Sequence, residues 1–277
     1  GPVTDVLSVE RPPEPGRWAS ITWLGVAMAA FWAIVIVAVI YALAIGLDPQ
    51  RFGTYGWRIV GGFLTTLRLV AISLAVGAVL SVPVAMGRLS ASRPIGLLAY
   101  GYSYFFRGTP IIAQLFLIYY GAGQFAPQLK AIGLWWFFRD AFNCAVFSFA
   151  LNTAAYQAEI LAGSVRGVDN GQREAAWALG LAPIATLRKV ILPQALISAL
   201  RPYGNEAIIM VKASAIASIV TVLDLMGQTR FVFSKTYDLS FYIWAAVFYL
   251  VLVEVMSRII NAIEARITRH IILRHQH

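Results

Sequence analysis

The sequence predicts an all-α, polytopic membrane protein with about six transmembrane helices. Of the 277 residues, 59% are hydrophobic and only 13% are charged, and the mean hydropathy is +0.71. This is more apolar surface than one soluble core can bury. The apolar residues also form runs, such as 23–47 and 61–86, that are long enough to cross about 30 Å of hydrocarbon. Because these runs lack a two-residue alternation of polar and apolar positions, they favour helices over a β-barrel.

The chain divides into a tail, six spans and a second tail. Four prolines among charged residues predict a flexible tail over residues 1–17. The first span is expected at residues 18–46, since its apolar run is too long for the core of a signal peptide. Further spans are expected at about 59–86, 97–121, 142–163, 195–223 and 241–263, with a tail at 267–277.

The basic residues indicate membrane topology rather than nucleic-acid binding. The net charge is +9, but its lysines and arginines lie in short segments between apolar runs instead of forming one stripe. With a cytoplasmic amino terminus, the inside segments hold twelve of these residues and the outside loops six. The positive-inside rule therefore predicts that both termini are cytoplasmic. A single cysteine, Cys144, and histidines confined to residues 270–277 predict neither a disulfide nor a metal site.

The longest inside loop, residues 163–193, is built like a docking element. Asp169 and Gln172 have the spacing of a capping box, which predicts the start of a helix. Gly180 suits a left-handed cap at its end, and Pro183 follows soon after. The helix is therefore barely three turns long, and such short helices need a partner to be stable.

The side chains on this short helix fit a groove on another protein. Ala175 and Ala176 allow a close backbone approach, and Trp177 provides an aromatic anchor. Arg173 and Glu174 are expected at the rim of the contact. An interfacial linker helix is the alternative interpretation.

The same loop resembles the EAA loop of permease subunits in binding-protein-dependent ABC importers. The residues that carry the resemblance are Glu174-Ala175-Ala176, Gly180, Leu192 and Pro193, with Val190 where the family has isoleucine. Elsewhere the chain looks like the polar amino-acid branch of histidine, arginine and opine permeases, through Phe106 to Pro110 with Gln114-Leu115, Leu151-Asn152-Thr153 with Tyr156 and Glu159, and Asn205-Glu206. The resemblance covers about residues 57–266.

This resemblance implies a type I importer core of five helices over residues 57–266, with the coupling loop at 164–193. The span at 18–46 is then an additional helix. Implied partners are a second permease subunit, related or identical, two ATP-binding subunits, and a periplasmic or lipid-anchored solute-binding protein, all at a bacterial inner membrane. The coupling residues carried over are Arg173, Glu174, Ala175, Ala176, Trp177, Gly180 and Pro193. The histidine and arginine type favours a heterodimer and a basic or opine-like substrate.

The chain is not expected to be an enzyme. A phosphate-binding P-loop needs glycine before its lysine, and none of the four lysines follows a glycine. The resemblance implies that ATP and Mg²⁺ bind a partner subunit and that this chain binds no cofactor. An ion-coupled secondary amino-acid carrier is the alternative, which explains charges inside the membrane but not the EAA loop.

Arg107 and Glu159 are charged residues inside predicted spans and should face partners or water. Pro110 leaves the Phe106 carbonyl without its helical donor, so the span is expected to kink there. Arg107 either fills this kink or acts in gating. Glu159 is expected to pair with Arg107 or Arg166, or to reach the cytoplasmic interface.

A passage for amino acids needs hydrogen-bond acceptors for an ammonium and donors for a carboxylate. Candidate pathway residues are therefore Arg107, Gln114, Asn152, Glu159, Asn205, Glu206, Lys212 and Ser214. Hydrogen bonding between helices is the alternative role for each of them.

Overall fold

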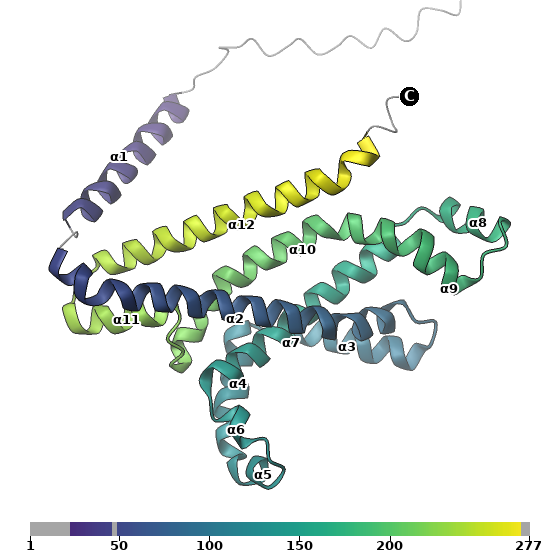
Figure 1. Cartoon of the computed structure of the whole chain (residues 1–277), viewed down its shortest axis with the longest axis horizontal. Coiled ribbons are helices and arrows are strands. Elements are labelled where there is room, and N and C mark those ends of the chain that lie inside the picture. Colours follow the sequence, from purple (N-terminus) through teal and green to yellow (C-terminus); the bar gives the residue numbers. More distant parts are fainter. Residues whose placement is uncertain (1–22, 46–48, 273–277) are drawn as a thin grey trace, which may run out of the picture. The chain divides into compact units, whose positions relative to one another are not determined.

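A computed structural model of the chain describes residues 23–45 and 49–272, with side chains at 23–44 and 49–267. Every regular element in these ranges is a helix, which confirms the all-α prediction (Figure 1). The chain separates into two compact units, residues 1–47 and 48–277. The predicted tail at 1–17 and the first residues of the span at 18–46 lie outside the described residues.

The first unit contains α1, Trp23–Ile45. Its described side chains are almost all apolar and none is buried within the unit. A helix that is apolar on every side is typical of a membrane span, because lipid is its solvent.

The second unit contains the remaining elements. In chain order these are α2 (Pro49–Leu89), α3 (Arg93–Gly108), α4 (Ile111–Gln124), α5 (Ala126–Ala131), α6 (Trp135–Phe138), α7 (Ala141–Arg166), α8 (Asn170–Ala178), α9 (Pro183–Thr186), the π-helix η1 (Leu187–Ile191), α10 (Leu192–Ser214), the 3₁₀-helix η2 (Ala215–Val220), α11 (Leu225–Thr236) and α12 (Ser240–Ile272). Within this unit α8 and α9 lie together at one end and α11 lies at the other (Figure 1).

Several apolar helices are long enough to cross a membrane. Among the described residues, length and composition select Trp23–Ala44, Pro49–Leu89, Pro183–Val220 and Ser240–Ile267, with Ile111–Gln124 as a shorter apolar helix. The predicted span at 97–121 is instead divided into α3 and α4. The predicted tail begins at residue 267, but α12 continues as helix through Ile272.

The predicted span at 142–163 corresponds to α7, a helix enclosed by several of its neighbours. Helix α7 contacts α2, α3, α4 and α10. Half of its 26 residues are buried, many of them alanines, and several are polar. Because its neighbours shield it, α7 can carry polar groups that a lipid-facing helix of this length would not tolerate. The central position of α7 therefore explains how a membrane helix can carry this many polar side chains.

Small residues allow α2 to approach α7 closely. Ala150, Ala154 and Ala158 of α7 are fully buried. At Gly77 of α2 an added Cβ would overlap the Cγ2 methyl of Thr153. Close contact through glycine and alanine is the usual way in which membrane helices associate, since lipid supplies no hydrophobic drive between them.

Candidate functional site

The break between α3 and α4 confirms the predicted kink at Pro110. Helix α3 ends at Gly108, and Thr109 is extended with φ −111° and ψ 146°. Pro110 then precedes the first residue of α4. Because proline has no N–H, the carbonyl one turn earlier, that of Phe106, loses its helical donor.

Two buried amides replace that missing donor. The Gln114 Nε2 atom donates to the Phe106 oxygen at 2.9 Å, and Asn152 Nδ2 of α7 donates to the same oxygen at 2.8 Å. Asn152 also donates to Gln114 Oε1 at 3.0 Å. The role at the kink that was considered for Arg107 is thus taken by amides, which fit the space and offer both a donor and an acceptor.

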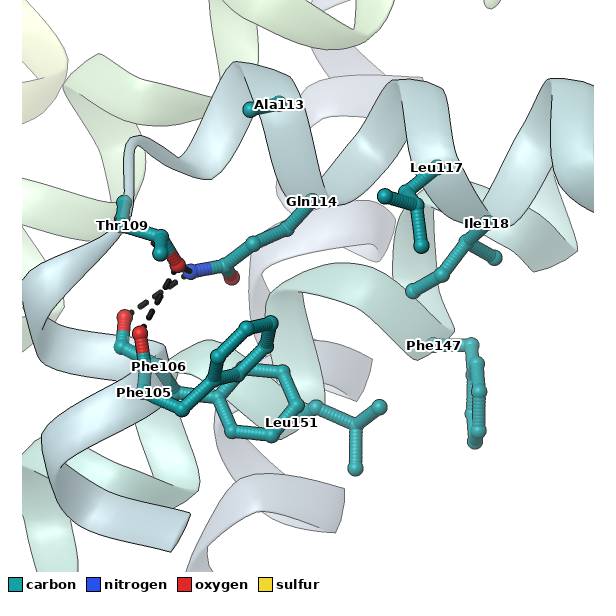
Figure 2. A pocket seen from close by; sticks show the side chains of 9 residues that line it. All are labelled: Phe105, Phe106, Thr109, Ala113, Gln114, Leu117, Ile118, Phe147 and Leu151. Carbon is teal, nitrogen blue, oxygen red and sulfur yellow. Dashed lines mark hydrogen bonds between the residues drawn. The ribbon is translucent and has the colours of Figure 1, made fainter. Parts of the chain in front are cut away.

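The kink borders a largely apolar cavity of about 290 Å³. Figure 2 shows the Gln114 amide reaching back to Thr109 and Phe106 on one side of the cavity, with Leu151 and Phe147 on another. Only Thr109 and Gln114 among its lining residues have polar side chains, and the Gln114 amide donates a hydrogen bond to the Thr109 hydroxyl. The cavity therefore offers little to recognise a polar ligand.

Replacing Asn152 with leucine is expected to lower the free energy of unfolding by about 1–2 kcal/mol. The change removes two hydrogen bonds and leaves the Gln114 oxygen without its donor. Denaturant titration of the purified chain in detergent measures the loss. Asn205→Leu is the matched control, because Asn205 is exposed on α10; equal stability of both variants would contradict this role of the amides.

A second cluster joins three charged side chains from α2, α3 and α7. Arg88 holds the Glu159 carboxylate from two sides, through Nε to Oε1 and through Nη2 to Oε2 at 3.5 Å. Arg107 is held more loosely, with Nη1 4.0 Å from Oε2. Its guanidinium lies over the Tyr156 ring, 5.4 Å from the centroid. Of the two predicted partners of Glu159, Arg107 lies at this distance, whereas the close pair is formed by Arg88.

Arg88 was not among the residues predicted to take part in a functional site. The predicted span ended at Met86, which put Arg88 in a loop, whereas α2 continues to Leu89 and directs this side chain to α7. An arginine within one turn of a span's end is a signal that sequence reasoning could have used, because such side chains reach back along the helix.

A third cluster surrounds Glu206, which is 5% exposed. Thr153 donates its hydroxyl to Glu206 Oε1 at 2.8 Å, and Gln157 donates to the Thr153 hydroxyl at 3.1 Å. These residues lie where α7 packs on α10. The Thr153 hydroxyl thus satisfies one oxygen of this buried carboxylate, and Gln157 orients that hydroxyl.

The remaining pathway candidates are not brought together with these clusters. Asn205 and Lys212 are exposed on α10, whereas Glu206 is buried on a different face of the same helix. Ser214 is fully buried and donates to the Val211 carbonyl at 2.7 Å, a bond within its own helix. The eight candidates are therefore divided: Gln114 with Asn152, Arg107 with Glu159, and Glu206 belong to the three clusters, and Asn205, Lys212 and Ser214 lie outside them.

Helix α8 matches the predicted docking helix in its position and ends. The Asp169 carboxylate caps it by accepting from the Gly171 N–H at 2.6 Å. Gly180, after its last turn, has φ +73°, the left-handed conformation that favours glycine. The predicted capping box is only half formed, because Gln172 instead accepts from Gln194 at 3.5 Å.

The side chains of α8 divide into an inward and an outward set. Ala176 is buried at 3% exposure, so it packs against the chain itself. Glu174, Ala175 and Trp177 are exposed, Trp177 at 59%. Pro193 lies in the first turn of α10 and is also exposed. The outward set leaves one face of α8 free for contact.

Arg173 fastens α8 to the end of α7. Its Nη2 atom donates to the Val165 carbonyl at 2.7 Å. We expect Arg173→Met to speed hydrogen exchange of the α8 amides roughly five- to tenfold, because about 1 kcal/mol of local anchoring is lost. Arg166→Met, which changes an exposed arginine of α7, should leave this exchange unchanged. Equal exchange in both variants would show that Arg173 does not anchor the helix.

In the ranges 23–44 and 49–267, no group of three or more His, Cys, Asp or Glu side chains is placed to hold a metal ion.

Comparison with known proteins gives consistent matches. Residues 77–269 match the family described as "Binding-protein-dependent transport system inner membrane component". The chain is 41% identical to the nopaline transport system permease protein NocM of Agrobacterium fabrum, over 77% of this chain and 89% of that protein. It is 37% identical to the histidine/lysine/arginine/ornithine transport system permease protein HisM of Escherichia coli K12, over 79% and 92%.

Solved structures agree with the fold. A chain from the crystal structure of an amino acid ABC transporter with histidines superposes with a TM-score of 0.70 at 34% identity, covering 79% of this chain and 99% of that one. A chain of the MetNI methionine ABC transporter in an inward-facing conformation superposes with a TM-score of 0.64 at 23% identity, covering 76% and 97%. At 23% identity, the match to the methionine transporter chain shows a shared fold only.

Proposed function

This chain belongs to the family of binding-protein-dependent transport system inner membrane components. We propose that it forms the translocation pathway of an ATP-driven importer for a polar amino acid of the basic or opine-like class. It is a multi-pass membrane permease subunit and not the ATPase. Relatives at 37–41% identity are named as permeases for nopaline, octopine and basic amino acids. None of these names describes an ion-coupled carrier.

The observation that carries the proposal is the geometry of α8. This helix is capped at both ends, anchored by Arg173 and exposed along Glu174, Ala175 and Trp177. A short helix with one unpartnered face suits a groove of another protein. We infer that a separate ATP-binding subunit provides that groove.

The assembly that we propose contains two permease subunits, related or identical, and two ATP-binding subunits, which hold ATP and Mg²⁺. A periplasmic or lipid-anchored solute-binding protein delivers the amino acid on the opposite side. Both termini of this chain are cytoplasmic, and α1 is an addition to a five-helix core. The chain works in the bacterial inner membrane without a cofactor or nucleic acid.

Transport follows from rigid-body motion of α8. Closure of the ATPase subunits displaces the helix, and the Arg173 contact passes the displacement to α7. Since α7 packs on α2, α3, α4 and α10, its tilt shifts the surrounding helices between inward-open and outward-open arrangements. Among the polar residues, Arg107, Gln114, Asn152, Glu159 and Glu206 border the moving helices, and Asn205, Lys212 and Ser214 complete the proposed pathway set.

Reconstitution in proteoliposomes tests the proposal. The chain is incorporated with its partner permease and ATPase, the binding protein is added, and uptake of a labelled amino-acid panel is measured. We expect uptake that requires ATP and every component and that persists when ionophores remove ion gradients. Uptake that follows an ion gradient and continues without the ATPase would instead establish the carrier alternative.

A further inference from the structure

We propose that the cavity between α2, α3 and α7 is a subsite that binds a carboxylate of the transported amino acid and prefers substrates with more than one carboxylate. The inference rests on the proposed import function and names the substrate class. The cavity has a volume of about 380 Å³, within the range of small-molecule sites. We call it the arginine pocket; its lining residues are Arg88, Tyr100, Ser103, Tyr104, Arg107, Gly108, Tyr156 and Glu159.

Among the residues that the structure describes, no carboxylate lies within hydrogen-bonding distance of the Arg107 guanidinium in the arginine pocket. Arg88 occupies both oxygens of Glu159, so these two charges compensate each other. Arg107 stays 4.0 Å from the same carboxylate, with 45% of its side chain exposed. Arg107 interacts with Glu159 at this distance and with Glu206 only at longer range, so its half-exposed N–H groups stay available to an added anion.

Arg107 is also presented in a geometry suited to carboxylate recognition. Its guanidinium lies over the face of the Tyr156 ring. Stacking on an aromatic face fixes the guanidinium plane and leaves its N–H edges available. A carboxylate can accept two parallel hydrogen bonds from such an edge, which is the strongest pairing that arginine makes.

An unsatisfied hydroxyl points to a ligand in the same pocket. Ser103 lines the cavity and is only 2% exposed. Its Oγ atom makes no hydrogen bond of normal geometry in the described part of the chain, although it neighbours the Glu159 carboxylate. Because buried hydroxyls are nearly always paired, a polar group of a bound substrate is a natural partner for it.

The charges around the pocket also predict which substrates are favoured. Glu206 does not line the cavity; it accepts a hydrogen bond from Thr153 and interacts with Arg107 only at longer range. A ligand whose only extra charge is cationic would bring that charge toward Arg88 and Arg107. A ligand with a second or third carboxylate gains an anion there instead. Each Glu159 oxygen can accept a second hydrogen bond besides that from Arg88, and the ammonium group that these substrates share can donate it.

Arginine, octopine and nopaline form a suitable series, since they share an arginine skeleton and carry one, two and three carboxylates. We would measure equilibrium binding of each labelled compound to the complex of this chain, its partner permease and the ATPase. The complex is held in phosphatidylcholine nanodiscs. The solute-binding protein is left out, so that the selectivity of that protein does not contribute to the measured affinities. The expected order of affinity is nopaline, octopine, arginine, with roughly tenfold between successive members.

Variants of Arg107 connect this order to the pocket. Arg107→Gln should weaken nopaline binding roughly 10- to 100-fold and arginine binding much less, because the charge-assisted pair is lost. Arg107→Lys keeps the positive charge but lacks the two parallel N–H donors of the guanidinium, so we expect an intermediate loss of nopaline affinity. Ser103→Ala should cost a few-fold. Arg93→Gln, at an exposed position outside the pocket, is the matched control and should bind like the wild type.

Equal affinity for the three compounds, or nopaline binding that Arg107→Gln leaves intact, would overturn the inference. Uptake by the wild-type transporter separates this failure from that of the proposed function. If ATP-dependent amino-acid uptake persists while the pocket variants behave as wild type, only the arginine pocket is rejected. If the wild type imports no amino acid with ATP, the importer proposal itself fails.

Discussion

Glu174→Arg is expected to reduce ATP-dependent uptake more than tenfold while the chain still inserts normally in the membrane. Glu174 is exposed on α8, on the face that we assign to the ATPase contact. Reversing a charge at a complementary interface costs several kcal/mol when it meets a like charge. The initial rate of uptake in proteoliposomes measures the loss.

The matched control for this prediction is a charge reversal elsewhere on the surface. Arg93→Glu changes an exposed residue at the first turn of α3, far along the chain from α8. It should leave uptake within about twofold of the wild type, because isolated exposed charges contribute little. If Glu174→Arg transports as well as Arg93→Glu, α8 is not the coupling surface.

Gly77→Ala is expected to destabilise the second unit by about 1–3 kcal/mol, since overpacking of a close helix contact forces the backbones apart. The new Cβ would overlap the Thr153 Cγ2 methyl and lie 3.3 Å from the Ala150 carbonyl oxygen. Unfolding by denaturant in detergent measures the change. Gly61→Ala is the control on the same helix, because a Cβ there meets nothing within 4 Å.

A second substitution makes the cause of this loss specific. Thr153→Ser removes the overlapping methyl and keeps the hydroxyl that donates to Glu206. The double variant Gly77→Ala with Thr153→Ser should therefore recover much of the lost stability, as expected for residues in direct contact. Additive losses in the double variant would show that the methyl is not the obstacle.

Local signals in the sequence predicted local structure well. Asp169 and Gly180 fix the ends of α8 through groups within two residues of each, so the spacing alone was informative. Pro110 removes a donor wherever it stands in a helix, so the kink was equally predictable. The all-α class followed from apolar runs that only helices can satisfy in lipid.

Contacts between distant segments were not predictable in the same way. Arg88 and Glu159 are 71 residues apart, and their pairing depends on how α2 packs against α7. The Asn152 bond to the Phe106 carbonyl likewise joins separate helices. Helix α11 was missed, because the turn before it depends on Asp224 capping the Gly227 N–H and on Thr66 accepting from the Leu225 N–H.

Polar residues weaken the hydropathy signal of α7, which nevertheless corresponds to the predicted span at 142–163. Helix α7 carries Asn152, Gln157 and Glu159, and hydropathy alone cannot distinguish such a helix from a loop-flanked surface helix. Its burial by α2, α3, α4 and α10 explains why those residues are tolerated. A one-dimensional pattern contains no information on which helices shield which.

Site-specific cross-linking tests the coupling role of α8 most directly. Cys144 is the single cysteine of the sequence. A Cys144→Ala, Ala175→Cys variant of this chain therefore carries one reactive thiol, at an exposed position of α8. A thiol-anchored photo-cross-linker at this position should capture the ATPase subunit in the assembled transporter, and the yield should change when ATP is trapped. The same reagent at Trp136→Cys, an exposed position on α6, should not capture it. Capture at residue 136 equal to that at residue 175, or none at residue 175, would contradict the account.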